Sequence, residues 1–233
     1  MIRRRIGTAG LLGMLLLEDE KLFEEFVQEL PVTVTDMFRD PAFYKSLKDK
    51  VFNRLATYPF IKIWIAGCAT GEEVYSLAIL LEEAGLLGRS RIYATDINQR
   101  SLQLAREGRY PVENLEQYAS GYKKAGGKKL LSDYYRMQHD SVLFNDNLKP
   151  NMIFAMHNLV MDQSFNEFHL IICRNVLIYF NQKLQNAVID LFYESLCPFG
   201  FLGLGSKESL LYAEKRKKFD DLDRKEKIFM KTE

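Results

Sequence analysis

The 233-residue chain contains only three cysteines and three histidines, the residues on which disulfide frameworks and most metal sites depend. Cys68, Cys173 and Cys197 lie far apart and include no C-x-x-C pair. An odd number of widely spaced cysteines is typical of a reducing compartment and argues against a disulfide-stapled scaffold. The histidines show no metal-ligand spacing either. We therefore expect a cytoplasmic protein without a metal site.

A large excess of charge of one sign is also absent. The 32 basic and 31 acidic residues give a net charge of +1. A strong positive charge is what draws a domain to nucleic acid or to an anionic membrane surface. We expect neither partner, and any basic patch should be local.

Long apolar runs are missing as well. A membrane-spanning helix needs about 20 apolar residues, whereas the apolar stretch at 10–17 (GLLGMLLL) is much shorter. Together with Arg3, Arg4 and Arg5 it imitates a signal peptide, but no small-residue cleavage site follows. We expect neither a signal peptide nor membrane insertion. With 47% hydrophobic residues, the chain suits one sizeable domain with small attachments.

The most informative stretch that is present runs from residue 61 to residue 76 (IKIWIAGCATGEEVYS). Alternating isoleucines at 61–65 predict a short central strand. Gly67 and Gly71 bracket small residues, so a ligand could approach the backbone of this loop closely before the next helix begins. The spacing is G-x-x-x-G rather than the G-x-G-x-x-G of dinucleotide-binding loops.

Two carboxylates indicate which ligand this loop would hold. Glu72 opens the helix, where a carboxylate repels pyrophosphate and attracts an ammonium group, such as that of the methionine part of S-adenosylmethionine. Asp96 follows a second predicted strand at 91–95, where an acidic residue typically binds a ribose diol. Both could instead be ordinary helix-cap carboxylates. Together they favour an adenosyl ligand without a diphosphate.

The rest of the chain predicts alternating helices and strands, and hence an α/β fold. A first helix is expected at 11–30, and Asp40 with Pro41 is expected to cap a second that extends to about Leu55. The rhythm breaks between 108 and 150, where a small antiparallel excursion is expected at about 130–152. The further elements predicted are helices at 72–84, 98–107 and 182–196, strands at 153–156, 168–173 and 201–205, and a terminal hairpin between 218 and 232.

Four stretches carry a resemblance to the CheR-type chemotaxis receptor methyltransferases over nearly the whole chain. In order, these are VTVTDMFRDP, GCATGEEVYSLA, ICRNVLIYF and GFLGLGSKESL. The resemblance implies a class I S-adenosylmethionine-dependent methyltransferase fold, a Rossmann-like sheet with a terminal antiparallel hairpin. It implies a short N-terminal helical subdomain with its linker at 1–56, truncated relative to the family, and a methyltransferase domain at 57–233. The excursion at about 130–152 would be the family's inserted β-subdomain.

The resemblance also implies roles for individual residues. Arg39, Arg174 and Tyr179 would act at the reactive end of the site. Thr33 stands where many members have Asn, and Val74 replaces a common Pro. Read without the resemblance, Thr33 is a strand residue, Arg39 a solvated charge and Tyr179 a half-buried aromatic. The cofactor contacts expected from the resemblance and the loop are Thr33, Thr35, Arg39, Gly67, Glu72, Asp96, Asn158, Leu159, Arg174 and Asn175.

The reaction implied is methyl transfer from S-adenosylmethionine to glutamate side chains of chemoreceptor cytoplasmic domains, giving methyl esters and S-adenosylhomocysteine. A glutamate is already ionised at neutral pH, so no general base is needed. Arg39 and Arg174 would orient the substrate carboxylate, and Tyr179 would pack against the sulfonium. The protein is expected to act as a monomer.

Two other functions remain open: a non-catalytic S-adenosylmethionine-binding signalling module and a nucleotide-dependent oxidoreductase, which Glu72 disfavours. Some family members dock on a peptide tether at the receptor C-terminus through a glycine-marked loop. Here no glycine occurs between Leu130 and Pro198. The sequence therefore predicts independence of the tether, with receptor recognition through basic residues of the N-terminal helices.

Overall fold

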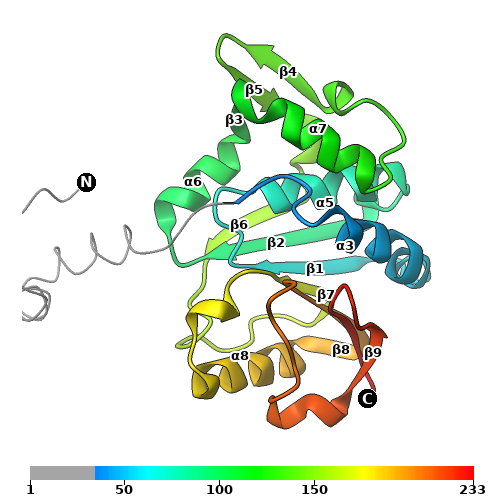
Figure 1. Cartoon of the computed structure of the whole chain (residues 1–233), viewed down its shortest axis with the longest axis vertical. Coiled ribbons are helices and arrows are strands. Elements are labelled where there is room, and N and C mark those ends of the chain that lie inside the picture. The colour runs from blue at the N-terminus through cyan, green and yellow to red at the C-terminus, as the bar shows by residue number, and fades with distance from the viewer. Residues whose placement is uncertain (1–34) are drawn as a thin grey trace, which may run out of the picture.

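A computed structural model describes residues 35–233, which form a seven-stranded mixed sheet with helices on both faces (Figure 1). The strand order is β6-β2-β1-β7-β8-β10-β9. β1 (Ile61–Ala66) pairs in parallel with β2 (Ser90–Asp96) and β7 (Phe168–Cys173). The predicted helix at 11–30 and the predicted contact Thr33 lie outside the described residues.

The central strands are buried on both faces, as their apolar sequences predict. Ile61, Ile63 and Ile65 of β1 pack into one hydrophobic cluster, and Trp64 packs into a second cluster on the other face. Trp64 is fully buried, and its indole N–H donates to Thr95 Oγ1 at 2.8 Å. Because successive side chains of β1 point to opposite faces of the sheet, this strand contributes to a hydrophobic core on each face.

Helices from different parts of the chain cover the two faces. The first cluster receives α5 (Glu72–Glu83) and the helical segment made of α3 (Pro41–Ser46), the π-helical η1 (Leu47–Phe52) and α4 (Asn53–Leu55). The second cluster receives α8 (Gln182–Ser195), whose N-terminus is capped by the Asn181 side chain. α6 (Gln99–Glu107) lies beside β6 (Met152–Met156) and β2, with Asn98 as its cap.

A three-stranded antiparallel sheet, β3-β5-β4, stands above α5 with α7 (Leu115–Lys124) (Figure 1). Its strands are β3 (Arg109–Pro111), β4 (Tyr135–Gln138) and β5 (Ser141–Phe144). The boundary of about 130–152 predicted for this excursion needs correction, because β3 already belongs to it and Met152 begins β6 of the main sheet. β3 was missed because three residues ending in proline do not read as a strand.

The C-terminal part confirms the predicted hairpin. β10 (Ile228–Lys231) pairs antiparallel with both β8 (Leu196–Leu204) and β9 (Phe219–Asp223), so the last strand lies inside the sheet rather than at its edge. The remaining elements are short 3-10 turns: η2 (Leu87–Arg89), η3 (Val112–Asn114), η4 (Leu131–Tyr134), η5 (Asp146–Leu148), η6 (Leu177–Tyr179) and η7 (Glu214–Lys218).

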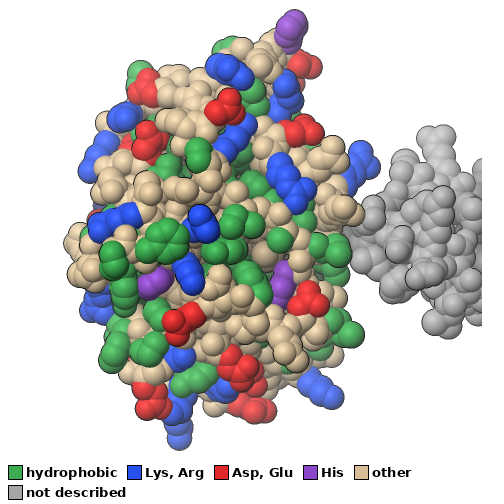
Figure 2. Space-filling view, turned by 180° about the vertical axis from the view of Figure 1, so that it is seen from behind, with side chains coloured by type: hydrophobic (Ala, Val, Ile, Leu, Met, Phe, Trp, Pro, Cys, Tyr) green, Lys and Arg blue, Asp and Glu red, His purple; other side chains and the backbone are tan. Residues whose placement is uncertain are grey.

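Acidic and basic side chains are interspersed on the face seen in Figure 2, in keeping with a net charge of +1. Within residues 35–233, no helix has the length and apolar character to cross a membrane. The three cysteines are free and buried.

Candidate active site

A cavity of about 660 Å³ opens at the carboxyl ends of β1, β2 and β7. After β1 the chain continues to α5 on one face of the sheet, and after the neighbouring β7 it continues to α8 on the other face. Such a point between two strands is where α/β sheets bind ligands. The volume suits a small-molecule cofactor. Nine of the predicted site residues line the cavity: Thr35, Arg39, Gly67, Asp96, Asn158, Leu159, Arg174, Asn175 and Tyr179.

The loop after β1 has the tight backbone that its glycines predict. Gly67, Ala69 and Gly71 all adopt positive φ angles, of 77°, 47° and 93°. A Cβ atom on Gly67 would lie 2.4 Å from Cγ2 of Val176. Gly67 is therefore needed for both its conformation and the close approach of two cavity-lining segments.

Asp96 holds this loop in place at the end of β2. One carboxylate oxygen accepts the backbone N–H of Ala69 at 2.8 Å, and the other accepts that of Asn98 at 2.9 Å. The side chain is half-buried and lines the cavity. Asp96 thus has a structural role in the loop, and its exposed edge remains available to a ligand hydroxyl.

Glu72 and Glu73 take different directions from the start of α5. Successive helical residues point about 100° apart, and Glu73 is the one that lines the cavity, whereas Glu72 is absent from its lining. Glu72 Oε2 instead accepts the Thr70 hydroxyl at 2.7 Å, and burial raises the pKa of this carboxyl. The structure therefore offers Glu73 to a ligand, while Glu72 points toward the neighbouring polar loop.

Arg174 lines the cavity, but its guanidinium is held between two carboxylates. Its Nη1 lies 2.9 Å from Glu73 Oε1, and its Nη2 lies 2.6 Å from Asp40 Oδ2. The guanidinium lies 4.4 Å from the centre of the Phe43 ring, and only 3% of the side chain is exposed. Burial alone lowers the pKa of Arg174, but Glu73, Tyr44 and Asp40 raise it overall.

These contacts require two corrections. Arg174 was expected to orient a substrate carboxylate, but its two terminal nitrogens already bind Glu73 and Asp40. Asp40 was expected to cap the following helix, but it has a φ of 55° and makes no side-chain cap. The Asp40 carboxylate instead forms an ion pair with the buried guanidinium of Arg174. A buried charge without such a partner would cost folding free energy. Arg174 therefore sets the position of Glu73.

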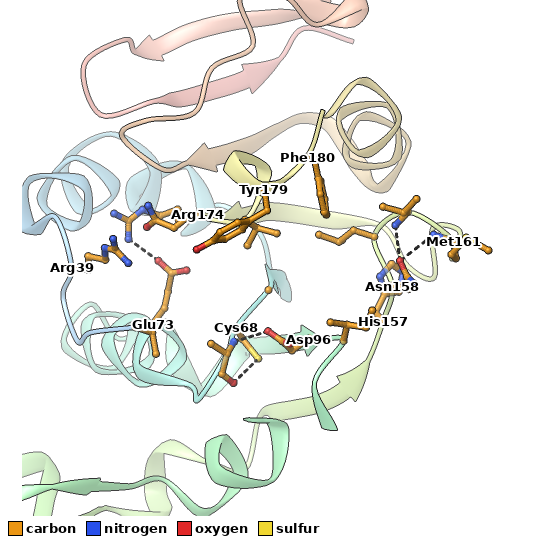
Figure 3. A pocket seen from close by; sticks show the side chains of 18 of the residues that line it. Arg39, Cys68, Glu73, Asp96, His157, Asn158, Met161, Arg174, Tyr179 and Phe180 are labelled. Carbon is orange, nitrogen blue, oxygen red and sulfur yellow. Dashed lines mark hydrogen bonds and ion pairs between the residues drawn. The ribbon is translucent and has the colours of Figure 1, made fainter. Parts of the chain in front are cut away.

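Arg39 and Tyr179 lie at the open side of the cavity (Figure 3). Arg39 is exposed, and Tyr179 is 60% exposed on the 3-10 turn η6. Met161, 77% exposed, lies farther along the rim, beside Asn158. Of the predicted catalytic residues, Arg39 and Tyr179 are thus the two that a macromolecular substrate could reach.

Asn158 shapes the cavity wall through its turn. Its side-chain oxygen accepts the backbone N–H groups of Val160 and Met161, at 3.0 and 3.3 Å. Its own N–H donates to Asp162 at 2.8 Å, and Leu159 is buried beside it. The turn therefore places Leu159, Val160 and Met161 in the cavity wall.

Sequence reasoning missed several lining residues, including Asp36, Cys68, Glu73, His157 and Phe180. His157 packs its ring 5.1 Å from that of Trp64 and contacts the backbone oxygen of Gln163 through Nε2. Its place directly after β6 was a usable signal, because side chains that follow parallel strands gather at one edge. Glu73 could have been found only by knowing the rotation of α5.

Comparisons with known proteins agree with this geometry. The family model described as "CheR methyltransferase, SAM binding domain" matches residues 33–228. The chain is 44% identical over 225 residues to a protein named "Putative methyltransferase Cher3" from Pseudomonas putida, covering 97% of this chain and 82% of the relative.

Two further relatives are named "Chemotaxis protein methyltransferase". That from Listeria monocytogenes is 28% identical, over 91% of this chain and 78% of its own length. That from Escherichia coli is 30% identical, over 83% of this chain and 67% of its own length. The family model spans most of the sheet domain, and the cavity of this domain carries the carboxylates of Glu73 after β1 and Asp96 at the end of β2. The chain belongs to the CheR methyltransferase family and is an S-adenosylmethionine-dependent methyltransferase.

Proposed function

We propose that this enzyme methylates glutamate side chains of chemoreceptor cytoplasmic domains, giving glutamate methyl esters. The observation that carries this proposal is the composition of the cavity mouth, where Arg39 and Tyr179 are accessible beside a buried Arg174–Glu73 pair. Cys68 lines the cavity but is a poor candidate for a nucleophile of a different reaction. Burial raises the pKa of Cys68 well above its ordinary value, which disfavours a thiolate.

The cavity suits the cofactor on chemical grounds. S-Adenosylmethionine supplies a methyl group on a positively charged sulfur, together with an ammonium group and a ribose diol. We assign the ammonium group to Glu73 and the diol to Asp96, with the turn at Asn158 and Leu159 beside the adenine. Asn175 and Thr35 complete the polar lining.

The protein's own residues then have positioning tasks. A glutamate carboxylate is ionised at neutral pH, so the site need only align it and exclude water. Arg39 is the residue we assign to orient this carboxylate, because it is exposed and lines the cavity, whereas only 3% of the Arg174 side chain is exposed. Tyr179 is assigned to cover the site from the solvent side, because it lines the cavity and is 60% exposed.

The proposed reaction has a distinctive product. We expect the enzyme to transfer labelled methyl groups from S-adenosylmethionine to a receptor cytoplasmic fragment, with release of labelled methanol in mild alkali because carboxyl methyl esters hydrolyse readily. A fragment whose methylatable glutamates are changed to alanine is the control and should remain unlabelled. Binding of S-adenosylhomocysteine without any transfer would instead favour the non-catalytic signalling module.

We also propose that the enzyme does not need a C-terminal receptor tether. The absence of glycine from this part of the sequence does not support the prediction, because His139 in the β4–β5 turn adopts a positive φ of 54°. The edge strand β4 supports the proposal on other grounds. It has only four residues and exposes Arg136, and short charged edges resist the addition of a further strand.

Removing the receptor tail tests this second proposal. We expect the methylation rate of a tail-less fragment to stay within about twofold of that of the intact fragment. We also expect both rates to fall by about tenfold between low and physiological salt, since screening weakens recognition by charge. A rate that depends on the tail but hardly on salt would show that the small sheet docks a peptide.

A further inference from the structure

The carboxylate of Glu208 is buried behind the cavity wall and binds four backbone N–H groups. Its Oε1 accepts from Val176 at 2.9 Å and from Leu177 at 2.8 Å. Its Oε2 accepts from Gly205 at 2.6 Å and from Asn175 at 3.1 Å. Only 4% of the residue is exposed. Four backbone donors around one carboxylate form an anion-binding nest within the protein itself.

These four donors come from two segments that are far apart in the chain. Asn175, Val176 and Leu177 follow β7, and Gly205 follows β8. Glu208 itself belongs to the second segment, where its own N–H donates to the Gly205 carbonyl at 2.9 Å. One side chain thus fastens the segment after β7 to the turn after β8.

The fastened segment forms one wall of the cofactor cavity. Asn175 and Val176 line the cavity, and Asn175 has a φ of 61°, an angle that asparagine adopts more readily than most residues. Val176 also approaches Gly67 closely. η6 begins at Leu177 and ends at Tyr179, so a shift at Leu177 would move Tyr179 as well.

We propose that Glu208 is a positioning residue of the cofactor site: its ionised carboxylate holds the segment 175–179 in the conformation that binds S-adenosylmethionine. Glu208 is absent from the cavity lining and acts only through the backbone it binds. The proposal rests on membership of the methyltransferase family and is independent of which substrate is methylated.

Glu208→Gln separates a positioning role from a general structural one. A glutamine keeps the size of the side chain but replaces one acceptor oxygen with an N–H₂ donor, which must face one pair of backbone N–H groups. We expect the dissociation constant of S-adenosylhomocysteine, measured by calorimetry, to rise about tenfold. Hydrogen exchange of the amides of residues 175–177 and 205 should accelerate by a similar factor.

Glu83→Gln is the matched control. Glu83 Oε1 also accepts several donors, the Tyr134 hydroxyl at 3.2 Å and the Lys128 N–H at 2.9 Å among them, but Glu83 does not line the cavity. We expect this variant to lose thermal stability while its affinity for S-adenosylhomocysteine stays within twofold of the parent value.

Gly205→Ala tests the same contact independently, in case Glu208→Gln does not fold. A Cβ at this position would lie 2.7 Å from Glu208 Oε2 and 2.9 Å from the Asn175 nitrogen. It should therefore weaken cofactor binding in the same direction. The proposal is overturned if a folded Glu208→Gln or Gly205→Ala protein binds with unchanged affinity, or if Glu83→Gln weakens binding equally.

Discussion

Replacing Arg174 by methionine is expected to lower the free energy of unfolding by about 3–5 kcal/mol and to abolish measurable methyl transfer. Methionine fills much of the same volume but leaves the carboxylate of Glu73, which is largely buried, without its cation. Removing one partner of a buried ion pair costs this much because the remaining charge is not solvated. Denaturant unfolding and a methyl-transfer assay would measure the two effects.

Arg216→Met provides the control for this prediction. Arg216 lies 2.8 Å from Asp221, with about a third of each side chain exposed. Pairs exposed to this extent contribute at most about 1 kcal/mol. A double variant, Arg174→Met with Glu73→Gln, should lose less stability than the two single losses added together. The reason is that Glu73→Gln removes the carboxylate charge that Arg174→Met alone would leave buried and unpaired. Additive losses would contradict direct coupling between these residues.

Replacing Glu73 by glutamine is expected to weaken the binding of S-adenosylhomocysteine by about 10- to 100-fold, the effect of losing one charge-assisted hydrogen bond of about 1.5–3 kcal/mol. Adenosine lacks the ammonium group, so its affinity should change by less than threefold. Calorimetric titration of both ligands measures the difference. An equal loss for both would mean that the cavity had been distorted rather than that one contact had been removed.

Glu72→Gln is the matched control, since the two residues are neighbours with the same chemistry. Its side chain is buried against Thr70 and lies outside the cavity lining. We expect S-adenosylhomocysteine affinity to remain within about threefold. A selective loss in Glu72→Gln, with Glu73→Gln unaffected, would restore Glu72 as the ammonium partner that its place at the start of the helix predicts.

The sequence predicts the strand and the turn before these two glutamates but not which of the two faces the cavity. The alternating isoleucines at 61–65 were enough to predict β1, and the positions of Gly67 and Gly71 predicted the turn. Both features depend on local chemistry. The choice between Glu72 and Glu73 depends on the rotation of α5 about its axis, which packing against the sheet determines and local spacing does not.

Long-range pairing limited the other predictions in the same way. Asp40 before Pro41 has the composition of a helix cap, yet its carboxylate binds Arg174, which lies 134 residues away. β3 is too short to be recognised until β5 is beside it. The role of Glu208 was hidden for the same reason, because its donors at 175–177 are more than 30 residues away in the chain.

The placement of β10 has a consequence for how the protein is made. β10 follows β9 in the chain but lies between β8 and β9 in the sheet, and β9 makes its sheet contacts through β10. During translation, the apolar β8 edge must therefore stay open until residues 228–231 have left the ribosome. Ser46 of α3 and Lys50 of η1 bind Asp223 of the same hairpin. These contacts of the α3–η1 segment can therefore form only after the hairpin has been synthesised. Exposed strand edges in incomplete chains pair readily with other chains. Nascent chains stalled just before β10 are thus the species that chaperones would have to protect.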